Sequence, residues 1–265
     1  MEIVFEQVGY KDKLNHIDLK FSNKDTIGIL GKHSSYVVSM ILGDLFPLVG
    51  KVTINGTESN IDSKAELQKQ IAYIRKDSIN SFHQEIVLAE IGTIVDSKEY
   101  KNLNINKRIK DAFSMVGLNE SYLTRRFDTM SSSELYMVQL AMQFICNPKI
   151  IILESPFVCL DYNNKKRLLK LLELLKEKYH KMIIICDEDV NVLYQHTDKV
   201  IFAKDCNHVS IYDTYDFFTS VKFLKANHIE LPKLIDITYR GKLKGVKLTY
   251  QKDIRDIIKD IYKHV

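Results

Sequence analysis

The chain has 265 residues, of which 45% are hydrophobic, so it can bury a substantial core as one large domain or as one domain with an appendage. Its formal net charge is only +4 and it has no long basic run, so charge gives no argument for nucleic-acid binding. No stretch approaches the roughly 20 apolar residues of a membrane-spanning helix, and the first residues lack the pattern of a secretion signal. We therefore expect any membrane association to depend on a partner.

The cysteines are widely spaced and form no C-x-x-C pair. They are Cys146, Cys159, Cys186 and Cys206, each in or beside an apolar segment. This pattern predicts reduced, buried thiols and a cytosolic protein.

Two segments near the N-terminus, residues 2–8 and 17–21, alternate apolar and polar side chains, which predicts two half-exposed strands. A short buried strand over residues 26–30 then leads into a polar turn at 31–36 and a helical segment at 37–42. A strand, a turn and a helix in this order are the context that a phosphate-binding loop requires. Such a loop needs glycines whose backbone N–H groups approach phosphate oxygens, and a lysine for the terminal phosphates.

Further strands follow this turn. Residues 50–56 read as a strand that ends in an Asn-Gly turn, and residues 71–74 read as another strand. Between residues 78 and 129 the chain is polar, with intermittent helical patterns.

A serine-rich turn opens the most regular pattern of the chain. Ser131 and Glu134 have the S-x-x-E spacing of a capping box, apolar side chains recur after them at helical spacing, and Asn147-Pro148 ends the helix. Residues 150–153 are a continuous apolar run, which is typical of a parallel strand covered on both faces. The run stops at Glu154, so a carboxylate lies at the carboxyl end of the strand.

An amphipathic helix is predicted over residues 166–177, and strands are predicted over 182–185 and 200–202. The first of these two strands stops before Asp187. Because ligands of open α/β sheets bind outside the carboxyl ends of parallel strands, the residues after each strand are the candidates for a site.

The order of serine-rich turn, helix, Asn-Pro, apolar strand, acid-x-Pro and Leu-Asp resembles that of ATP-binding-cassette (ABC) ATPases. In that family the turn is the signature loop (LSGGQ), the strand ends in the Walker B motif (ILDEP), and Leu-Asp begins the D-loop. Here the three segments read MSSSE, ILESP and CLD. The resemblance covers nearly the whole chain. It implies an α/β P-loop NTPase fold with a mainly parallel core sheet, an antiparallel β subdomain and a small helical subdomain.

The tail narrows the resemblance to one branch of the family. Leu231-Pro232 and a later helix opened by Thr249 look like the C-terminal extension of energy-coupling factor (ECF) transporter ATPase subunits, where the extension helps two subunits pair. We therefore expect an ABC-type nucleotide-binding domain over residues 1–210, with its helical subdomain at about 78–146, and a C-terminal extension over 211–265.

The resemblance implies nucleotide-binding roles around the first turn. Counted back from Gly43, which matches the glycine after the family's helix, the phosphate loop is about three residues short. In that register Ser34 stands where the family has its lysine, and Ser35 falls on the hydroxyl that binds magnesium. Gly31 is what remains of the glycines. Lys32 either reaches a phosphate or is an ordinary exposed turn lysine, and Ser35 equally reads as a polar residue that opens its helix.

Three residues outside the loop are further candidates by resemblance. Tyr10 stands near the aromatic residue that stacks on adenine, although it also reads as a packed or exposed turn tyrosine. Ser131 holds the signature position, from which it would serve the nucleotide of a paired subunit, or it only caps its helix. Asp161 begins the D-loop.

The family's catalytic positions carry different residues here. Glu154 replaces the Walker B aspartate and, with Ser35, is the candidate for holding magnesium. Ser155 replaces the glutamate that polarises water, Asp187 replaces the histidine that touches the terminal phosphate, and Lys76 replaces the glutamine that contacts the metal. The resemblance therefore implies that no catalytic side chain is intact.

Five apolar residues of the predicted helical subdomain are candidates for contact with a membrane partner. They are Phe82, Ile86, Val87, Leu88 and Ile91. Ordinary core packing is the alternative for this apolar stripe.

The leading hypothesis is a degenerate, non-hydrolysing ABC subunit of an ECF-like importer on the cytoplasmic face of the cell membrane. We expect it to pair with an intact ABC ATPase subunit or with itself, to contact an integral membrane transporter component and to bind no nucleic acid. ATP and Mg²⁺ are expected to bind weakly or not at all at its own site. The alternatives are a nucleotide-independent scaffold or regulatory protein, and an active ATPase that uses Lys32, Glu154 and Glu188.

Overall fold

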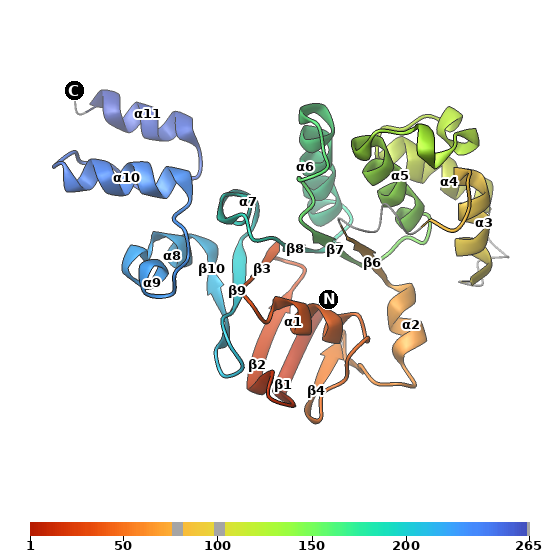
Figure 1. The fold of residues 1–265 in the computed structure, drawn as a ribbon, viewed down its shortest axis with the longest axis horizontal. Helices are drawn as coiled ribbons and strands as arrows, with labels where there is room; N and C mark the ends of the chain where they lie inside the picture. The colour runs from red at the N-terminus through yellow and green to blue at the C-terminus, as the bar shows by residue number, and fades with distance from the viewer. Residues whose placement is uncertain (76–81, 98–103, 264–265) are drawn as a thin grey trace.

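The computed structural model describes residues 1–75, 82–97 and 104–263 (Figure 1). Two sheets form its centre. The smaller sheet is antiparallel with the order β2-β1-β4-β5. Its strands are β1 (Glu2–Tyr10), β2 (Leu14–Ser22), β4 (Val49–Ile54) and β5 (Thr57–Glu58). Asn55 and Gly56 join β4 to β5 with positive φ angles, 53° and 82°, as an Asn-Gly hairpin turn requires. The predicted antiparallel subdomain is thus confirmed.

The larger sheet has six strands in the order β10-β9-β3-β8-β7-β6. All neighbours from β9 to β6 are parallel, and only β10 pairs antiparallel. The strands are β3 (Ile27–Leu30), β6 (Ile71–Ile74), β7 (Ile150–Glu154), β8 (Met182–Cys186), β9 (Lys199–Ala203) and β10 (Val209–Asp213). The mainly parallel core sheet expected from the sequence is therefore present, and the carboxyl ends of β3, β7, β8 and β9 meet at one edge.

The apolar run of β7 is continuous because both of its faces are covered. Ile150 and Ile152 belong to a core shared with the antiparallel sheet and α1, whereas Ile151 and Leu153 belong to a core shared with helices on the other face. Among the helices that pack on the sheet are α1 (Ser34–Ile41), α2 (Lys64–Lys69), α6 (Tyr162–Glu177) and α7 (Val190–His196).

The helical subdomain lies beside the β6 and β7 end of the core sheet, and the C-terminal helices lie at the opposite end of the molecule (Figure 1). The subdomain contains α3 (Val87–Ser97), α4 (Ile105–Met115), two short 3₁₀ helices, η2 (Glu120–Thr124) and η3 (Phe127–Thr129), and α5 (Ser132–Phe144). The C-terminal helices are α8 (Thr214–Thr219), α9 (Val221–Ala226), α10 (Lys233–Leu243) and α11 (Ile254–Lys263).

Two sequence expectations need correction. The last helix begins at Ile254 and not at Thr249, whose hydroxyl instead donates a hydrogen bond to Asp260. All four cysteines are free, but only Cys146 is buried, while the other three are half-buried. Within the described ranges, no helix is both long and apolar enough to cross a membrane.

Candidate functional site

The turn between β3 and α1 is shorter than a phosphate-binding loop. β3 ends at Leu30 and α1 begins at Ser34, so only Gly31, Lys32 and His33 connect them. The G-x-x-x-x-G-K-[ST] loop has more residues because its backbone must wrap around the phosphates. The turn is even shorter than the sequence suggested, since α1 starts within the segment expected to be a turn.

This short turn packs against the end of β9. Gly31 has a φ angle of 113°, and a Cβ atom there would lie 2.4 Å from the carbonyl oxygen of Ala203. The backbone N–H of His33 donates to that same oxygen at 3.1 Å. Only glycine fits so close to a neighbouring backbone, so the one glycine kept in the loop is explained by packing.

Other polar groups of the turn are also engaged within the protein. The N–H of Ser34 donates to the carbonyl oxygen of Gly31 at 3.1 Å. The Nδ1 atom of His33 lies 2.9 Å from the carbonyl oxygen of Lys13, which belongs to the β1–β2 turn. These bonds hold the turn between the antiparallel sheet and the core sheet.

The residues near the turn that are predicted to contact a nucleotide differ in their exposure. Lys32 and Ser35 are exposed, and Ser34 is half-buried. Tyr10 is half-buried with its ring centroid 6.3 Å from that of Tyr36, the residue after Ser35. The fold therefore brings Tyr10 beside the start of α1, although the sequence separates them, and the binding roles of these residues stay predictions.

Glu154 is contacted by one residue of the neighbouring strand β6 and by the residue that follows this strand. The hydroxyl of Tyr73 donates to its Oε2 at 3.0 Å, and Nε of Arg75 lies 3.8 Å from the same oxygen. Burial, followed by the negative charge of Glu154, raises the pKa of Tyr73, so this hydroxyl remains a donor. In the sheet, β8 lies between β7 and β3, so one strand separates Glu154 from the turn that follows β3.

The described residues contain no hydrogen bond between Glu154 and Ser35. Nor does this part of the chain contain three His, Cys, Asp or Glu side chains grouped as a metal site. The magnesium role of Glu154 and Ser35 stays a prediction.

Ser155 and Asp187 lie at the adjoining ends of β7 and β8. Ser155 has a φ of 45°, an uncommon value for a residue with a side chain, and its N–H donates to the carbonyl oxygen of Cys186 at 2.8 Å. Asp187 is half-buried, and the N–H of Asp189 donates to its Oδ1 at 3.0 Å. Burial is the main cause of its raised pKa, to which the charges of Asp189 and Glu188 also contribute. Lys76, which stands where the family has its glutamine, lies outside the described residues.

The signature turn forms the predicted capping box. The N–H of Glu134 donates to Oγ of Ser131 at 3.3 Å, and the N–H of Ser131 donates to Oε2 of Glu134 at 2.9 Å. Tyr122 and Arg125 also donate to the Glu134 carboxylate, each at 2.7 Å. The Ser131 N–H, and after it Arg125 and Tyr122, lower the pKa of Glu134 to about 2. The capping role of Ser131 is confirmed, and its role toward a partner's nucleotide stays a prediction.

A second network joins the signature turn to the D-loop. Oγ of buried Ser133 donates to Oδ2 of Asp161 at 2.7 Å, and Nδ2 of Asn164 donates to Oγ of Ser133 at 2.8 Å. Asp161 is also the N-cap of α6, because it accepts the N–H of Asn164 at 2.9 Å. This N-cap bond is the main cause of the lowered pKa of Asp161. The Asp-x-x-Asn spacing signals the cap, but nothing in the sequence pairs Ser133 with Asp161.

The apolar stripe expected to face a membrane partner divides between core and surface. Val87 and Ile91 are 0% and 1% exposed, so they pack inside the helical subdomain. Phe82 stacks on Phe127 with ring centroids 3.9 Å apart. Ile86 and Leu88 are 39% and 48% exposed, and only these two remain open to a partner.

Comparisons with known proteins agree with this architecture. The energy-coupling factor transporter ATP-binding protein EcfA2 of Mycoplasma mobile is 24% identical over 277 aligned residues, covering 95% of this chain and 90% of that protein. The solved structure of cbiO1 from Clostridium perfringens, part of the ABC transporter complex cbiONQ, superposes with a TM-score of 0.72. That likeness covers 89% of this chain and 98% of the other at 19% identity, and it concerns the fold.

A second solved structure is the dimeric ATP-binding cassette MJ0796 bound to ADP and Pi. It superposes with a TM-score of 0.67 at 18% identity, over 80% of this chain and 98% of that chain. The family model described as ABC transporter matches residues 14–158, more than half of the chain. This chain belongs to the ABC transporter family.

Proposed function

We propose that this chain is a non-hydrolysing ATP-binding-cassette subunit of an importer of the energy-coupling factor type. Its family membership and its likeness to EcfA2 along 95% of the chain support the transporter role. The observation that carries the non-hydrolysing role is the three-residue turn from Gly31 to His33, which packs against Ala203.

This turn does not fit tight binding of a magnesium-bound triphosphate. The N–H groups of His33 and Ser34 already donate to carbonyl oxygens, and a serine stands where the family has its lysine. A phosphate would have to displace these backbone bonds, and it would gain no ammonium group from α1. Exposed Lys32 is the one lysine of the turn.

The residues after β7 and β8 do not replace the missing chemistry. Ser155 is not basic enough to take a proton from water at neutral pH, and loss of a general base typically lowers the rate about 10²- to 10⁴-fold. A carboxylate at Asp187 would repel phosphate oxygens, by roughly 4 kcal/mol at 4 Å and an effective dielectric constant of 20. Each substitution alone disfavours hydrolysis, and together they support a subunit that serves another site.

That other site is the one built with an intact ABC ATPase subunit. In this proposal the N-terminus of α5, with Ser131, faces the nucleotide of the partner, where the partial positive charge of a helix end favours phosphate. The Ser133–Asp161 bond fixes the D-loop against this helix. Residues 1–210 form the cassette, with its helical subdomain at about 78–146, and residues 211–265 contribute to pairing. Exposed Ile86 and Leu88 contact the membrane component, which places the chain at the cytoplasmic face of the membrane.

Affinity purification of the full chain from its native cells tests this assembly. We expect an intact ABC ATPase subunit and an integral membrane protein to copurify with it. Recovery of neither would favour the alternative, a nucleotide-independent scaffold or regulatory protein on an ABC fold. Equilibrium binding of MgATP to the purified chain tests the site itself, and submicromolar affinity abolished by Ser35→Ala would contradict the proposal.

A further inference from the structure

A small cavity lies at the amino ends of β7 and β8, at the edge of the core sheet opposite to the phosphate-loop turn. Its volume is about 70 Å³. Most of its lining is apolar or aromatic and consists of Met115, Phe144, Pro148, Ile151, Leu175 and Tyr179. Asn147 and Lys181 complete the lining. A single lysine therefore lines a cavity whose other walls are largely apolar.

Both the backbone and the ammonium group of Lys181 are fixed by hydrogen bonds. Lys181 precedes Met182, the register partner of Ile150 on β7, and its N–H donates to the carbonyl oxygen of Leu175 at 3.0 Å. Its Nζ atom donates to Oδ1 of Asn147 at 2.7 Å. Asn147 lies between α5 and β7, so this bond joins the two turns that lead into β7 and β8.

The surroundings of Lys181 disfavour its positive charge. Lys181 is half-buried, and within the described ranges its ammonium group forms no ion pair. Lys149 precedes Ile150, so the parallel pairing of β7 with β8 brings the backbones of the two lysines to neighbouring positions. Burial, and after it the charge of Lys149, lowers the pKa of Lys181. A larger fraction of this amine is therefore unprotonated near neutral pH than of a lysine in water.

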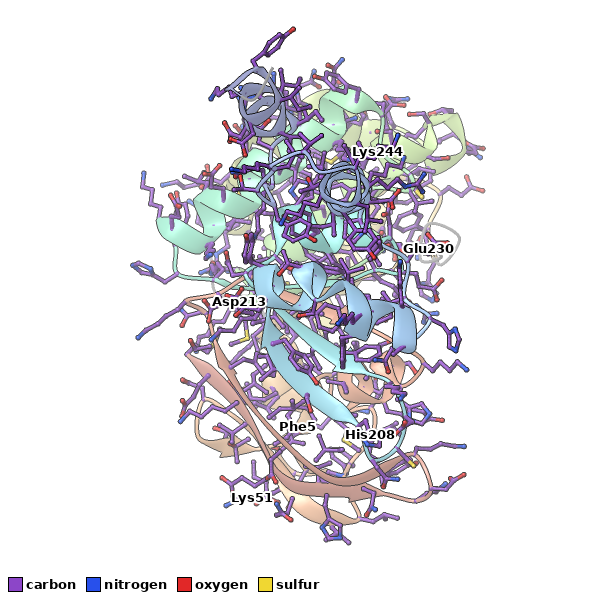
Figure 2. All side chains as sticks on the ribbon, turned by 90° about the vertical axis from the view of Figure 1, so that its left-hand side faces the viewer. Phe5, Lys51, His208, Asp213, Glu230 and Lys244 are labelled. Carbon is purple, nitrogen blue, oxygen red and sulfur yellow. The ribbon has the colours of Figure 1, made fainter. Side chains whose placement is uncertain are left out.

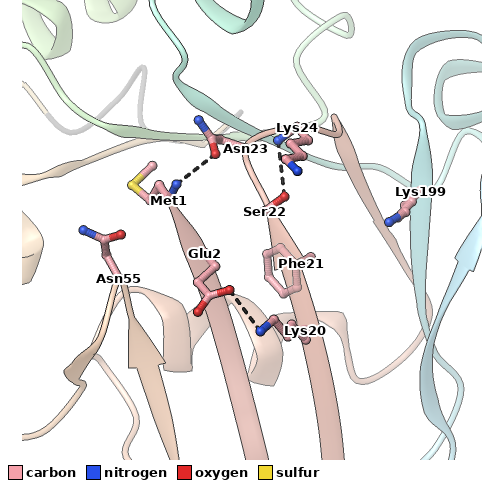
Figure 3. A pocket seen from close by; sticks show the side chains of 9 residues that line it. All are labelled: Met1, Glu2, Lys20, Phe21, Ser22, Asn23, Lys24, Asn55 and Lys199. Atoms are coloured by element: carbon pink, nitrogen blue, oxygen red, sulfur yellow. Dashed lines mark hydrogen bonds and ion pairs between the residues drawn. The ribbon is translucent and has the colours of Figure 1, made fainter.

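Two other lysines provide references for the reactivity of Lys181. Lys20 also lines a cavity, beside β1 and β2, but its Nζ atom lies 3.1 Å from Oε2 of Glu2 (Figure 3). Lys244 is exposed among the C-terminal helices (Figure 2), and it forms no ion pair with any residue that the structure describes. The first reference has a cavity but a paired charge, and the second has neither a cavity nor a paired charge.

We propose that Lys181 is an acylation site whose donors are acyl phosphates with a small apolar acyl group, such as acetyl. The unprotonated Nζ atom attacks the carbonyl carbon, a C–N bond forms, the C–O bond to phosphate breaks, and the extra proton of the nitrogen passes to water. Nothing is oxidised or reduced. This inference goes beyond the proposed transport role and does not depend on it.

The class of donor follows from the charge and the size of the site. Exposed Lys149 offers a positive charge to the phosphate of the donor, which then leaves as inorganic phosphate. The cavity of about 70 Å³ suits an acyl group of a few atoms, since one water molecule occupies about 30 Å³ in the liquid. Its apolar lining favours a hydrocarbon acyl group over a polar one.

Acetylation of the folded full chain by acetyl phosphate at pH 8 tests the proposal, with the initial rate at each lysine measured by peptide mass spectrometry. We expect Lys181 to be acetylated about fivefold or more faster than Lys244, and Lys20 no faster than Lys244. In guanidinium chloride, which unfolds the chain and removes the cavity, the rates at Lys181 and Lys244 should agree within about twofold. A rate at Lys181 no higher than at Lys244 in the folded chain, or a preference that persists in the unfolded chain, would overturn the proposal.

The variant Lys149→Gln tests the choice of an anionic donor. It removes a charge that attracts the phosphate and that also favours the unprotonated form of Lys181, so acetylation of Lys181 should slow about twofold or more. Lys244→Gln is the matched control and should leave the rate at Lys181 unchanged. An equal rate at Lys181 in Lys149→Gln and in the wild type would contradict recognition of an acyl phosphate at this site.

Discussion

The substitution Gly31→Ala tests the packing of the short turn against β9. The new Cβ atom would lie 2.4 Å from the carbonyl oxygen of Ala203, a distance that side-chain carbons do not adopt, so the turn or the end of β9 must move. The φ angle of 113° adds a conformational cost for any residue with a Cβ. The substitution therefore combines two penalties that a control can separate.

Gly56→Ala is that control. Gly56 also has a positive φ, 82°, but a Cβ there would meet no atom within 4 Å. Its cost is the backbone penalty alone, about 1–2 kcal/mol. Gly31→Ala bears a similar penalty plus about 1–3 kcal/mol for overpacking, so we expect a total loss of about 2–5 kcal/mol.

Equilibrium unfolding in urea measures both losses. The predicted result is that Gly31→Ala lowers the free energy of unfolding clearly more than Gly56→Ala does. Equal losses would mean that the turn does not pack on Ala203. The proposed lack of tight phosphate binding at this turn would then lose its structural reason.

Three further predictions concern the helices. Glu134→Gln should cost about 1–2 kcal/mol at pH 7 in thermal unfolding. The pKa of Glu134 is lowered to about 2, so this stabilisation is complete above the ordinary pKa of 4.5 and is lost as the pH falls toward 2. The difference in stability between Glu134→Gln and the wild type should therefore shrink between pH 6 and pH 2.5. An unchanged difference would contradict the network around Glu134. Ser133→Ala, which removes a buried hydroxyl bonded to Asp161, should cost about 1–2 kcal/mol in urea unfolding, while exposed Ser132→Ala should stay within about 0.5 kcal/mol. Ile91→Ala should lower the free energy of unfolding by about 2–5 kcal/mol. Leu88→Ala should change it by no more than about 0.5 kcal/mol, but it should lower the amount of membrane partner that copurifies with the chain. The reverse pattern would mean that Ile91, and not Leu88, contacts the partner.

Local sequence patterns predicted the elements whose causes are local. The capping box of Ser131 and Glu134 is specified by residues three positions apart, and the helix that follows it begins where the pattern placed it. The continuous apolar run of β7 likewise reflects burial on both faces, which one segment can show by itself.

Contacts between distant segments could not be predicted from the sequence. Gly31 owes its place to Ala203, and Ser133 owes its hydrogen bonds to Asp161, and no local pattern pairs such residues. The sequence shows the apolar stripe of the helical subdomain. It does not show that Val87 is buried and Leu88 exposed, because this depends on which neighbours cover each side of α3. The same holds for the cavity beside Lys181, because its walls come from segments that meet only in the folded chain.

The proposed non-hydrolysing role is tested most directly by phosphate release from the purified chain alone with MgATP. We predict release at the background level of a buffer control, unchanged by Glu154→Gln. Steady magnesium-dependent release that Glu154→Gln abolishes would show a working hydrolytic site in this chain and contradict the proposed function.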